Sequence, residues 1–256
     1  MISCVFNGRL GNNLFEMANV MSIANKLNEE FIFPKKTWAG HRGYIDVDLS
    51  MFNYDFNRGS LETLNEYSES SFNYEEIQLT SNLKLSGFYQ SWKYFEDIKD
   101  LLINKYFTPS LKVQESIKRF NLEKNTLGIS IRRGDYLMLQ NNHCVLSVDY
   151  YQSAIDKYFM HGIESIYVFS DDIDWCKEVF GSNVHYVTED VGTQLFLMSK
   201  MKNLILSNST FSWWGAYLNQ EKGIIIAPDP WFGPDNLDKD TKDLYYPSWI
   251  INIITT

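Results

Sequence analysis

Two adjacent arginines, Arg132 and Arg133, open the segment RRGDY, which directly follows the apolar run TLGISI at 126–131. The chain has six arginines, so a neighbouring pair at the end of a predicted strand indicates a local role for positive charge. A guanidinium group can bind a phosphate through two parallel hydrogen bonds. The pair therefore predicts an anionic ligand, and structural salt bridges within the protein are the alternative.

A second candidate segment, Asn208-Ser209-Thr210-Phe211, lies between the apolar run 203–207 and a helical pattern at 211–219. The first turn of a helix binds anions through its backbone N–H groups and its dipole. Ser209 and Thr210 would suit a phosphate at this point. The alternative is that the same hydroxyl groups cap the helix.

Acidic residues follow another predicted strand, 165–169. A carboxylate of Asp171 or Asp172 at this place could accept hydrogen bonds from a base edge or a ribose hydroxyl. Asp172 and Asp174 also form a DxD pattern, which suggests a metal-dependent enzyme as an alternative. Helix capping by these carboxylates is the structural alternative.

The amino-terminal part contains a glycine loop, Gly8-Arg9-Leu10-Gly11-Asn12-Asn13, between the apolar run 2–6 and a helical pattern. Glycine allows the backbone to come close to a ligand. The chain has neither GxGxxG nor GxxxxGK[ST], which weakens dinucleotide and P-loop interpretations.

Composition excludes several classes of protein. The 256-residue chain carries a net charge of −9, so nucleic acid is not expected as a partner. Three scattered cysteines and four histidines without ligand spacing indicate neither a disulfide framework nor a zinc site. We find neither a signal peptide nor an apolar run long enough to span a membrane, and we expect a cytoplasmic location.

The apolar periodicity predicts an α/β protein. In the second half, predicted strands alternate with predicted helices, a pattern typical of a parallel Rossmann-like sheet. We expect strands at 126–131, 165–169, 184–187, 203–207 and 223–227, and helices at 148–160, 173–180, 191–201 and 211–219. In the first half we expect strands at 2–6 and 83–88, a helix at 94–106 and an irregular region at 34–80. The predicted domains are 1–120 and 121–256.

The segments GRLGNNLFEMA, SGFYQSWKYF, SIRRGDYL, YVFSDDIDWCKE and SNSTFSWWGAYLN occur in this order. Together they resemble glycosyltransferase family 11, the α-1,2-fucosyltransferases. The resemblance implies a B-type glycosyltransferase fold, with two Rossmann-like halves facing a cleft. It implies inverting transfer of L-fucose from GDP-L-fucose to the 2-hydroxyl of a galactose-containing glycan, without a cofactor or a required metal. A peripheral contact with a lipid-linked acceptor is compatible with it.

The resemblance also assigns roles to residues. Arg132 and Arg133 would hold the pyrophosphate, together with the helix start at Asn208, Ser209, Thr210 and Phe211. Asp171 or Asp172 would contact guanosine, and Gly11, Asn12 and Asn13 would face the donor from the first domain. Asp135 is a third candidate catalytic residue, as an orienting group or as a base, and Glu16 is a second candidate base.

Ser130 departs from the family pattern, because this position usually holds a histidine near the nucleotide. A serine keeps a hydrogen-bonding group there but has less reach and no charge. The candidate acceptor contacts are His41, Arg42 and Trp92. Trp38, Tyr44 and Tyr94 are plausible contacts as well, and for all six residues a structural role is the alternative.

Three other functions remain open at this point. The first is transfer of another GDP-linked sugar or transfer to a protein hydroxyl. The second is a non-catalytic module that binds carbohydrate or nucleotide, and the third is the metal-dependent enzyme described above.

Overall fold

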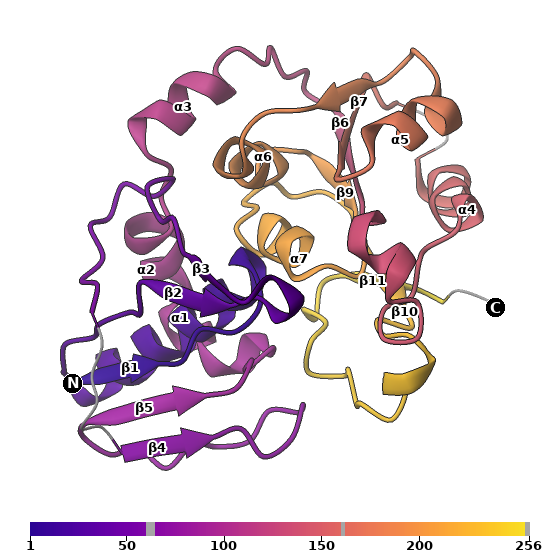
Figure 1. Ribbon diagram of the computed structural model, residues 1–256. Coiled ribbons are helices and arrows are strands. Elements are labelled where there is room, and N and C mark those ends of the chain that lie inside the picture. The colour runs from indigo at the N-terminus through magenta and orange to yellow at the C-terminus, as the bar shows by residue number, and fades with distance from the viewer. Residues whose placement is uncertain (60–64, 160–161, 254–256) are drawn as a thin grey trace. The chain divides into compact units, whose positions relative to one another are not determined.

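The computed structural model describes residues 1–59, 65–159 and 162–253. The chain divides into two compact units (Figure 1). The first unit consists of residues 1–111 and 240–245, and the second consists of residues 112–239 and 246–256.

The first unit is built on a three-stranded parallel sheet. Strand β5 (Leu83–Ser86) lies between β1 (Ile2–Cys4) and β4 (Asn65–Ser68). Helix α1 (Leu10–Leu27) follows β1 and is buried along most of its length. The predicted strand, glycine loop and helix are therefore confirmed.

The region expected to be irregular contains a hairpin, in which β2 (Lys36–Trp38) pairs antiparallel with β3 (Tyr44–Asp46). The first unit also has a series of short turns where one helix at 94–106 was predicted. These turns are η2 (Trp92–Tyr94), η3 (Glu96–Ile98), α2 (Lys99–Leu101) and the π-helical turn η4 (Leu102–Tyr106). The prediction of one continuous helix was wrong, because the backbone leaves helical dihedral angles at Phe95 (φ −141°) and at Ile98 (φ −113°).

The second unit contains a six-stranded sheet in which every pair of neighbours is parallel. Its strand order is β11-β10-β9-β6-β7-β8. The strands are β6 (Thr126–Ile131), β7 (Ser165–Ser170), β8 (His185–Val187), β9 (Asn203–Ile205), β10 (Ile225–Asp229) and β11 (Ile250–Ile253). The five predicted strands are confirmed. The prediction missed β11, because no helical pattern separates this short run from the irregular segment before it.

Helices cover both faces of this sheet (Figure 1). Helices α4 (Val148–Tyr158) and α5 (Ile173–Phe180) lie on one side, and α6 (Val191–Met198) and α7 (Thr210–Tyr217) lie on the other. Three further short elements are α3 (Leu111–Ile117), η5 (Gly134–Met138) and η6 (Pro234–Asn236).

Strand β6 is buried on both faces, as the central strand of such a sheet must be. Leu127, Ile129 and Ile131 belong to the core cluster that includes residues of α4 and α5. On the opposite face, a Cβ at Gly128 would lie 2.7 Å from the Cγ of Met201, so this position needs a residue without a side chain.

The division of the chain differs from the predicted division at residue 120. The first unit ends at Leu111, and residues 240–245 belong to it although they come late in the chain. Lys93 Nζ binds the Asp243 carboxylate at 2.5 Å, and Asn73 Nδ2 donates to Asp240 Oδ2 at 3.2 Å. Contacts across so many residues leave no periodic pattern in the sequence.

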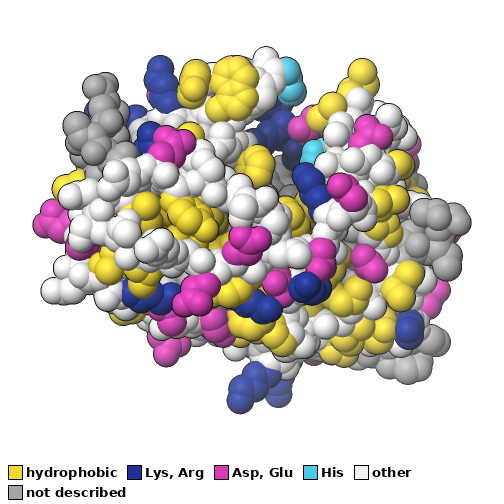
Figure 2. Space-filling view, turned by 90° about the horizontal axis from the view of Figure 1, so that it is seen from below, with side chains coloured by type: hydrophobic (Ala, Val, Ile, Leu, Met, Phe, Trp, Pro, Cys, Tyr) yellow, Lys and Arg dark blue, Asp and Glu magenta, His cyan; other side chains and the backbone are white. Residues whose placement is uncertain are grey.

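The surface mixes charged, polar and apolar side chains, as the face drawn in Figure 2 shows. Within the described part of the chain, no helix combines the length and the apolar character needed to cross a bilayer.

We expect Ile129→Ala to lower the free energy of unfolding by about 2–5 kcal/mol, since it removes a fully buried side chain from β6. Ile253, which is 73% exposed on β11, provides the control. Ile253→Ala should change the free energy by no more than about 0.5 kcal/mol. Urea unfolding measures the free energy of unfolding of both variants. If both substitutions lowered it equally, the assignment of β6 to the core would be contradicted.

Candidate functional site

The strand order of the second unit determines where a ligand can bind. The chain runs outward from β6 through β7 to β8, then returns to the other side of β6 as β9. Ligands of such sheets bind at the carboxyl ends of the strands, at the point where the order reverses. The residues that follow β6 and β9 are the arginine pair and the Asn208–Phe211 segment. The fold thus brings together the two segments that the sequence predicts as anion-binding.

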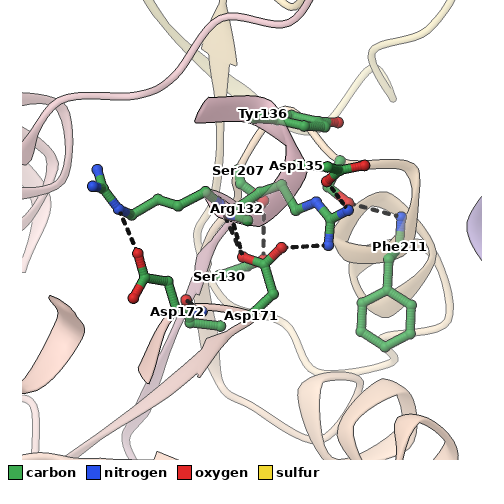
Figure 3. A network of polar contacts seen from close by, with 12 residues as sticks. Ser130, Arg132, Asp135, Tyr136, Asp171, Asp172, Ser207 and Phe211 are labelled. Atoms are coloured by element: carbon green, nitrogen blue, oxygen red, sulfur yellow. Dashed lines mark hydrogen bonds and ion pairs between the residues drawn. The ribbon is translucent and has the colours of Figure 1, made fainter. Parts of the chain in front are cut away.

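Arg132 lies between two carboxylates (Figure 3). Its Nη2 is 2.5 Å from Asp135 Oδ1, and its Nη1 is 2.6 Å from Asp171 Oδ2. The guanidinium carbon also lies 5.2 Å from the centre of the Tyr136 ring, within the range of a cation–π contact. These contacts give the guanidinium plane of Arg132 a defined orientation.

Arg133, like Arg132, contacts a carboxylate and an aromatic ring. Its Nε lies 3.1 Å from Asp172 Oδ2, and its guanidinium carbon lies 3.9 Å from the centre of the Trp175 ring. Both arginine side chains keep less than a fifth of their surface exposed, 19% for Arg132 and 17% for Arg133.

Asp171 organises the loop that carries both arginines. One oxygen of its carboxylate binds Arg132, and the other accepts the backbone N–H groups of Arg133 at 2.9 Å and Gly134 at 3.3 Å. A Cβ at Gly134 would come within 2.4 Å of the same carboxylate. Glycine therefore allows this close approach of backbone and carboxylate, which a residue with a Cβ would permit only if the Asp171 side chain moved.

The salt bridges that the sequence left as an alternative are present. Three carboxylates, Asp135, Asp171 and Asp172, accompany two guanidinium groups, so the cluster carries no excess of positive charge. A guanidinium group has five N–H donors, and the ion pairs of Arg132 use two of them. The arrangement can therefore bind an anion through oriented N–H groups.

The Asn208–Phe211 segment forms the start of α7. Ser209 is the N-cap residue, and its Oγ accepts the backbone N–H of Phe211 at 3.3 Å. Thr210 is the first residue of the helix. Capping and anion binding are compatible, since one cap satisfies one of the four unpaired N–H groups of a helix start.

Asn208 is buried and connects three segments. Its Nδ2 donates to the carbonyl oxygens of Cys144 at 2.8 Å and Trp231 at 2.9 Å. The backbone carbonyl oxygen of Asn208 accepts the hydroxyl of Tyr136 at 3.1 Å. This last bond joins the arginine loop directly to the start of α7.

Ser130, at the position that departs from the family pattern, points into a buried group of serines. Its Oγ lies 3.1 Å from the Oγ of Ser207, which in turn lies 3.4 Å from the Oγ of Ser212. Only 5% of Ser130 is exposed. The structure thus gives its hydroxyl a partner inside the protein, and a contact of Ser130 with a donor stays a prediction.

The two acids of the DxD pattern have separate roles. Asp172 caps α5 by accepting the backbone N–H of Trp175 at 3.3 Å. The Asp174 side chain is 96% exposed and pairs with Lys177 at 3.4 Å. Within residues 1–59, 65–159 and 162–253, no three His, Cys, Asp or Glu side chains are grouped so that they could hold a metal ion.

The glycine loop of the first unit rests on a buried polar network. Glu16 is fully buried, and its carboxylate accepts the backbone N–H of Asn7 at 2.9 Å and Nδ2 of Asn13 at 3.1 Å. Asn13 Nδ2 also lies 3.1 Å from the Oγ1 of Thr37, whose hydroxyl donates to the carbonyl of Gly8 at 3.0 Å. Burial raises the pKa of the Glu16 carboxyl group well above its usual value. Glu16 supports the loop, and its burial excludes it as a base that touches substrate in this conformation.

The three loop residues predicted to face the donor differ in exposure. Gly11 and Asn13 are buried, whereas Asn12 is half-buried and its Oδ1 accepts from Gln90 Nε2 at 3.2 Å. Asn12 is therefore the residue of this set whose side chain reaches the surface of the first unit.

The three candidate acceptor residues lie on two elements of the first unit. His41 and Arg42 are exposed at the tip of the β2–β3 hairpin, in the short turn η1 (Gly40–Arg42). Trp92 is half-buried at the start of η2.

Two aromatic residues of the arginine site, Tyr136 and Trp175, were missed by sequence reasoning. Each lies beneath one guanidinium group. The signal was present, because Tyr136 belongs to RRGDY and Trp175 follows Asp172 at the spacing of one helical turn. The sequence does not show which face of each short helix meets the arginines.

Comparison with known proteins agrees with the motifs. The profile of Glycosyl transferase family 11 matches residues 1–252. The O-antigen biosynthesis glycosyltransferase WbnK of Escherichia coli is 28% identical, over 98% of this chain and 99% of the relative. An α-1,2-colitosyltransferase of E. coli is 35% identical over 62% of this chain and 60% of its own length. The rat galactoside α-(1,2)-fucosyltransferase 1 is 26% identical over 86% of this chain and 64% of its own length.

Solved structures of GT-B fucosyltransferases share the fold. NodZ from Bradyrhizobium aligns with a TM-score of 0.59 over 84% of this chain and 90% of NodZ, at 12% identity. POFUT1 in complex with GDP-fucose aligns with a TM-score of 0.59 over 87% of this chain and 95% of POFUT1, at 14% identity. With a family match over nearly the whole sequence, the chain belongs to glycosyltransferase family 11 and is a glycosyltransferase.

Proposed function

We propose that the protein transfers L-fucose from GDP-L-fucose to the 2-hydroxyl of a galactoside, with inversion at the anomeric carbon. The observation that carries this proposal is the meeting of Arg132 and Arg133 with the start of α7 at the switch point of a Rossmann-like sheet. Membership of a family whose relatives include galactoside α-(1,2)-fucosyltransferases supports it.

In this reaction the GDP group leaves while the acceptor oxygen attacks from the opposite face of the sugar. Negative charge grows on the leaving phosphate oxygen, and N–H groups already aimed at that oxygen stabilise the transition state. The guanidinium groups of Arg132 and Arg133 and the first backbone amides of α7 are suited to this task. Their ion pairs and ring contacts hold the arginines in place before the ligand arrives.

Asp135 acts through Arg132 in this proposal. Its carboxylate already accepts the guanidinium group at 2.5 Å, so an orienting role agrees better with its contacts than the role of a base. Asp171 and Asp172 orient the same two arginines, and a guanosine contact by either acid has no support from their present partners.

A specific observation supports a second candidate function. The relative that is 35% identical is named as a colitosyltransferase, so the donor could carry another deoxy sugar. A panel of GDP-fucose, GDP-colitose and GDP-mannose, each with a galactoside acceptor, tests the main proposal. Fastest transfer from GDP-fucose supports it, and faster transfer from GDP-colitose overturns it. GDP binding without GDP release in any of these mixtures would favour a non-catalytic binding module.

We expect Arg133→Ala to reduce kcat with GDP-fucose by roughly 100- to 1,000-fold, because it removes a preorganised donor to the leaving group. Arg119→Ala is the matched control, since Arg119 is exposed elsewhere in the second unit. The steady-state rate of GDP release gives kcat for both variants. A kcat within about threefold of the unchanged protein would show that Arg133 has no role at the phosphate.

Asp171→Ala removes the carboxylate that holds Arg132 and two loop amides. Charge-assisted hydrogen bonds of this kind contribute about 1.5–3 kcal/mol each, so we expect kcat/KM to fall by about 10- to 100-fold. Asp174→Ala should leave kcat/KM unchanged, because that carboxylate is exposed. Tighter GDP binding by Asp171→Ala in calorimetry would instead show that its negative charge mainly repels the phosphate.

We also propose that the reaction needs no metal ion, since arginines and helix amides serve the phosphates. Activity in excess EDTA should stay within about twofold of the untreated rate. Loss of activity in EDTA, with recovery on adding Mg²⁺ or Mn²⁺, would reject this part of the proposal. GDP release is again the measured quantity, and the same assay on Asp174→Ala tests whether the DxD pattern contributes.

A further inference from the structure

An exposed aromatic pair lies on the β2–β3 hairpin of the first unit. Trp38 and Tyr44 are opposite each other in the antiparallel register, so their side chains leave the same face of the hairpin. Trp38 is 47% exposed and Tyr44 is 70% exposed. Their ring centres are 5.2 Å apart and the ring planes meet at 64°, so the pair presents two apolar faces in different directions.

Such exposure is unusual for the described tryptophans. All seven tryptophans lie in the described ranges, and Trp38 alone among them is in the exposed class. The aromatic residues elsewhere mostly serve as core, as the fully buried Trp213 and Trp214 illustrate. Two adjacent aromatic rings left in water form a contiguous apolar patch, and such patches often serve as binding sites.

The pair is joined rigidly to the glycine loop. The backbone N–H of Gly8 donates to the carbonyl of Trp38 at 2.7 Å, and the N–H of Trp38 donates to the carbonyl of Phe6 at 3.1 Å. Thr37, whose side chain points inward, adds its bond to the Gly8 carbonyl. Trp38 therefore has a defined position next to the loop, and a ligand that binds to it does not have to order this part of the hairpin.

The surroundings of the pair match a sugar better than a protein partner. The neighbouring residues of the hairpin are charged or polar and exposed: Lys36 and Asp46 form the next pair on the same face, and His41 and Arg42 lie in the turn at the tip. A pyranose ring combines an apolar face of C–H groups with a rim of hydroxyl groups. Aromatic faces with a few polar groups around them complement that pattern.

We propose that Trp38 and Tyr44 form the stacking platform for the galactoside acceptor, beside the glycine loop of the first unit. This inference rests on the proposed fucosyl transfer and adds to it the place where the acceptor sugar binds. It assigns the acceptor to the hairpin, with His41 and Arg42 near its hydroxyl groups, and it gives Trp92 no direct part.

The test measures acceptor and donor dependence separately. We expect Trp38→Ala and Tyr44→Ala each to raise KM for a β-galactoside acceptor by about tenfold, which corresponds to about 1.4 kcal/mol. The affinity for GDP, measured by calorimetry, and the slow hydrolysis of GDP-fucose without acceptor should not change. Trp38→Phe, which keeps a ring, should recover most of the acceptor affinity.

Leu111→Ala is the control, because Leu111 is an apolar side chain that is 71% exposed at the end of the first unit. It should leave KM for the acceptor unchanged. An unchanged KM in both Trp38→Ala and Tyr44→Ala, with active and folded protein, would overturn the inference while leaving the proposed function intact. Absence of any fucose transfer by the unaltered protein would reject the proposed function instead.

A second copy of this chain is the competing occupant of the platform. Sedimentation velocity of the unaltered protein and of Trp38→Ala distinguishes a second copy from a sugar as the occupant. An oligomer that dissociates on Trp38→Ala, without a change in KM, would overturn the inference, whereas equal sedimentation of both proteins together with the raised KM supports it.

Discussion

The parallel pairing of β6 with β9 is the interaction on which the site of the second unit depends. These strands are far apart in the sequence, yet Leu127 pairs with Asn203 and Ile129 with Ile205. The pairing sets the end of β6 beside the end of β9, and the hydrogen bond from Tyr136 to the Asn208 carbonyl connects the loops that follow. Any change that shifts this register would separate the arginine loop from the start of α7, because both segments take their positions from the strands before them.

The charges at this site follow from the same geometry. Two arginines close to each other require counter-charges, and Asp135, Asp171 and Asp172 supply them. Partly buried ion pairs of this kind gain little stability on balance, since desolvation offsets much of the attraction. Their value lies in orientation, because a guanidinium plane held by carboxylates and an aromatic ring presents its remaining N–H groups in one direction. Under the proposed function, a nucleotide phosphate would meet donors that need little rearrangement.

In the first unit, a buried hydrogen-bond network holds the glycine loop in place. A single buried carboxylate, Glu16, accepts from the backbone before Gly8 and from Asn13, and Thr37 extends the network to the β2–β3 hairpin. A buried acid with neutral amide partners is costly to ionise, and burial raises the pKa of its carboxyl group. The network joins the glycine loop and the aromatic hairpin into one rigid surface.

The sequence by itself determined the α/β class, most strands and helices of the second unit, the family and the two segments that meet at the carboxyl ends of β6 and β9. It could do so because apolar periodicity, glycine loops and the RRGDY and SNSTF segments are local patterns. The tertiary structure decided which partners those residues have: the carboxylates on Arg132, the ring beneath Arg133, the buried position of Ser130 and the burial that excludes Glu16 as a base. It also decided that residues 240–245 return to the first unit and that Trp38 stays exposed while Trp213, Trp214, Trp231 and Trp249 form core. Such contacts join residues that are distant in the chain. The free energy that selects them comes from packing and hydrogen bonding in three dimensions, and these leave no periodic pattern in the sequence.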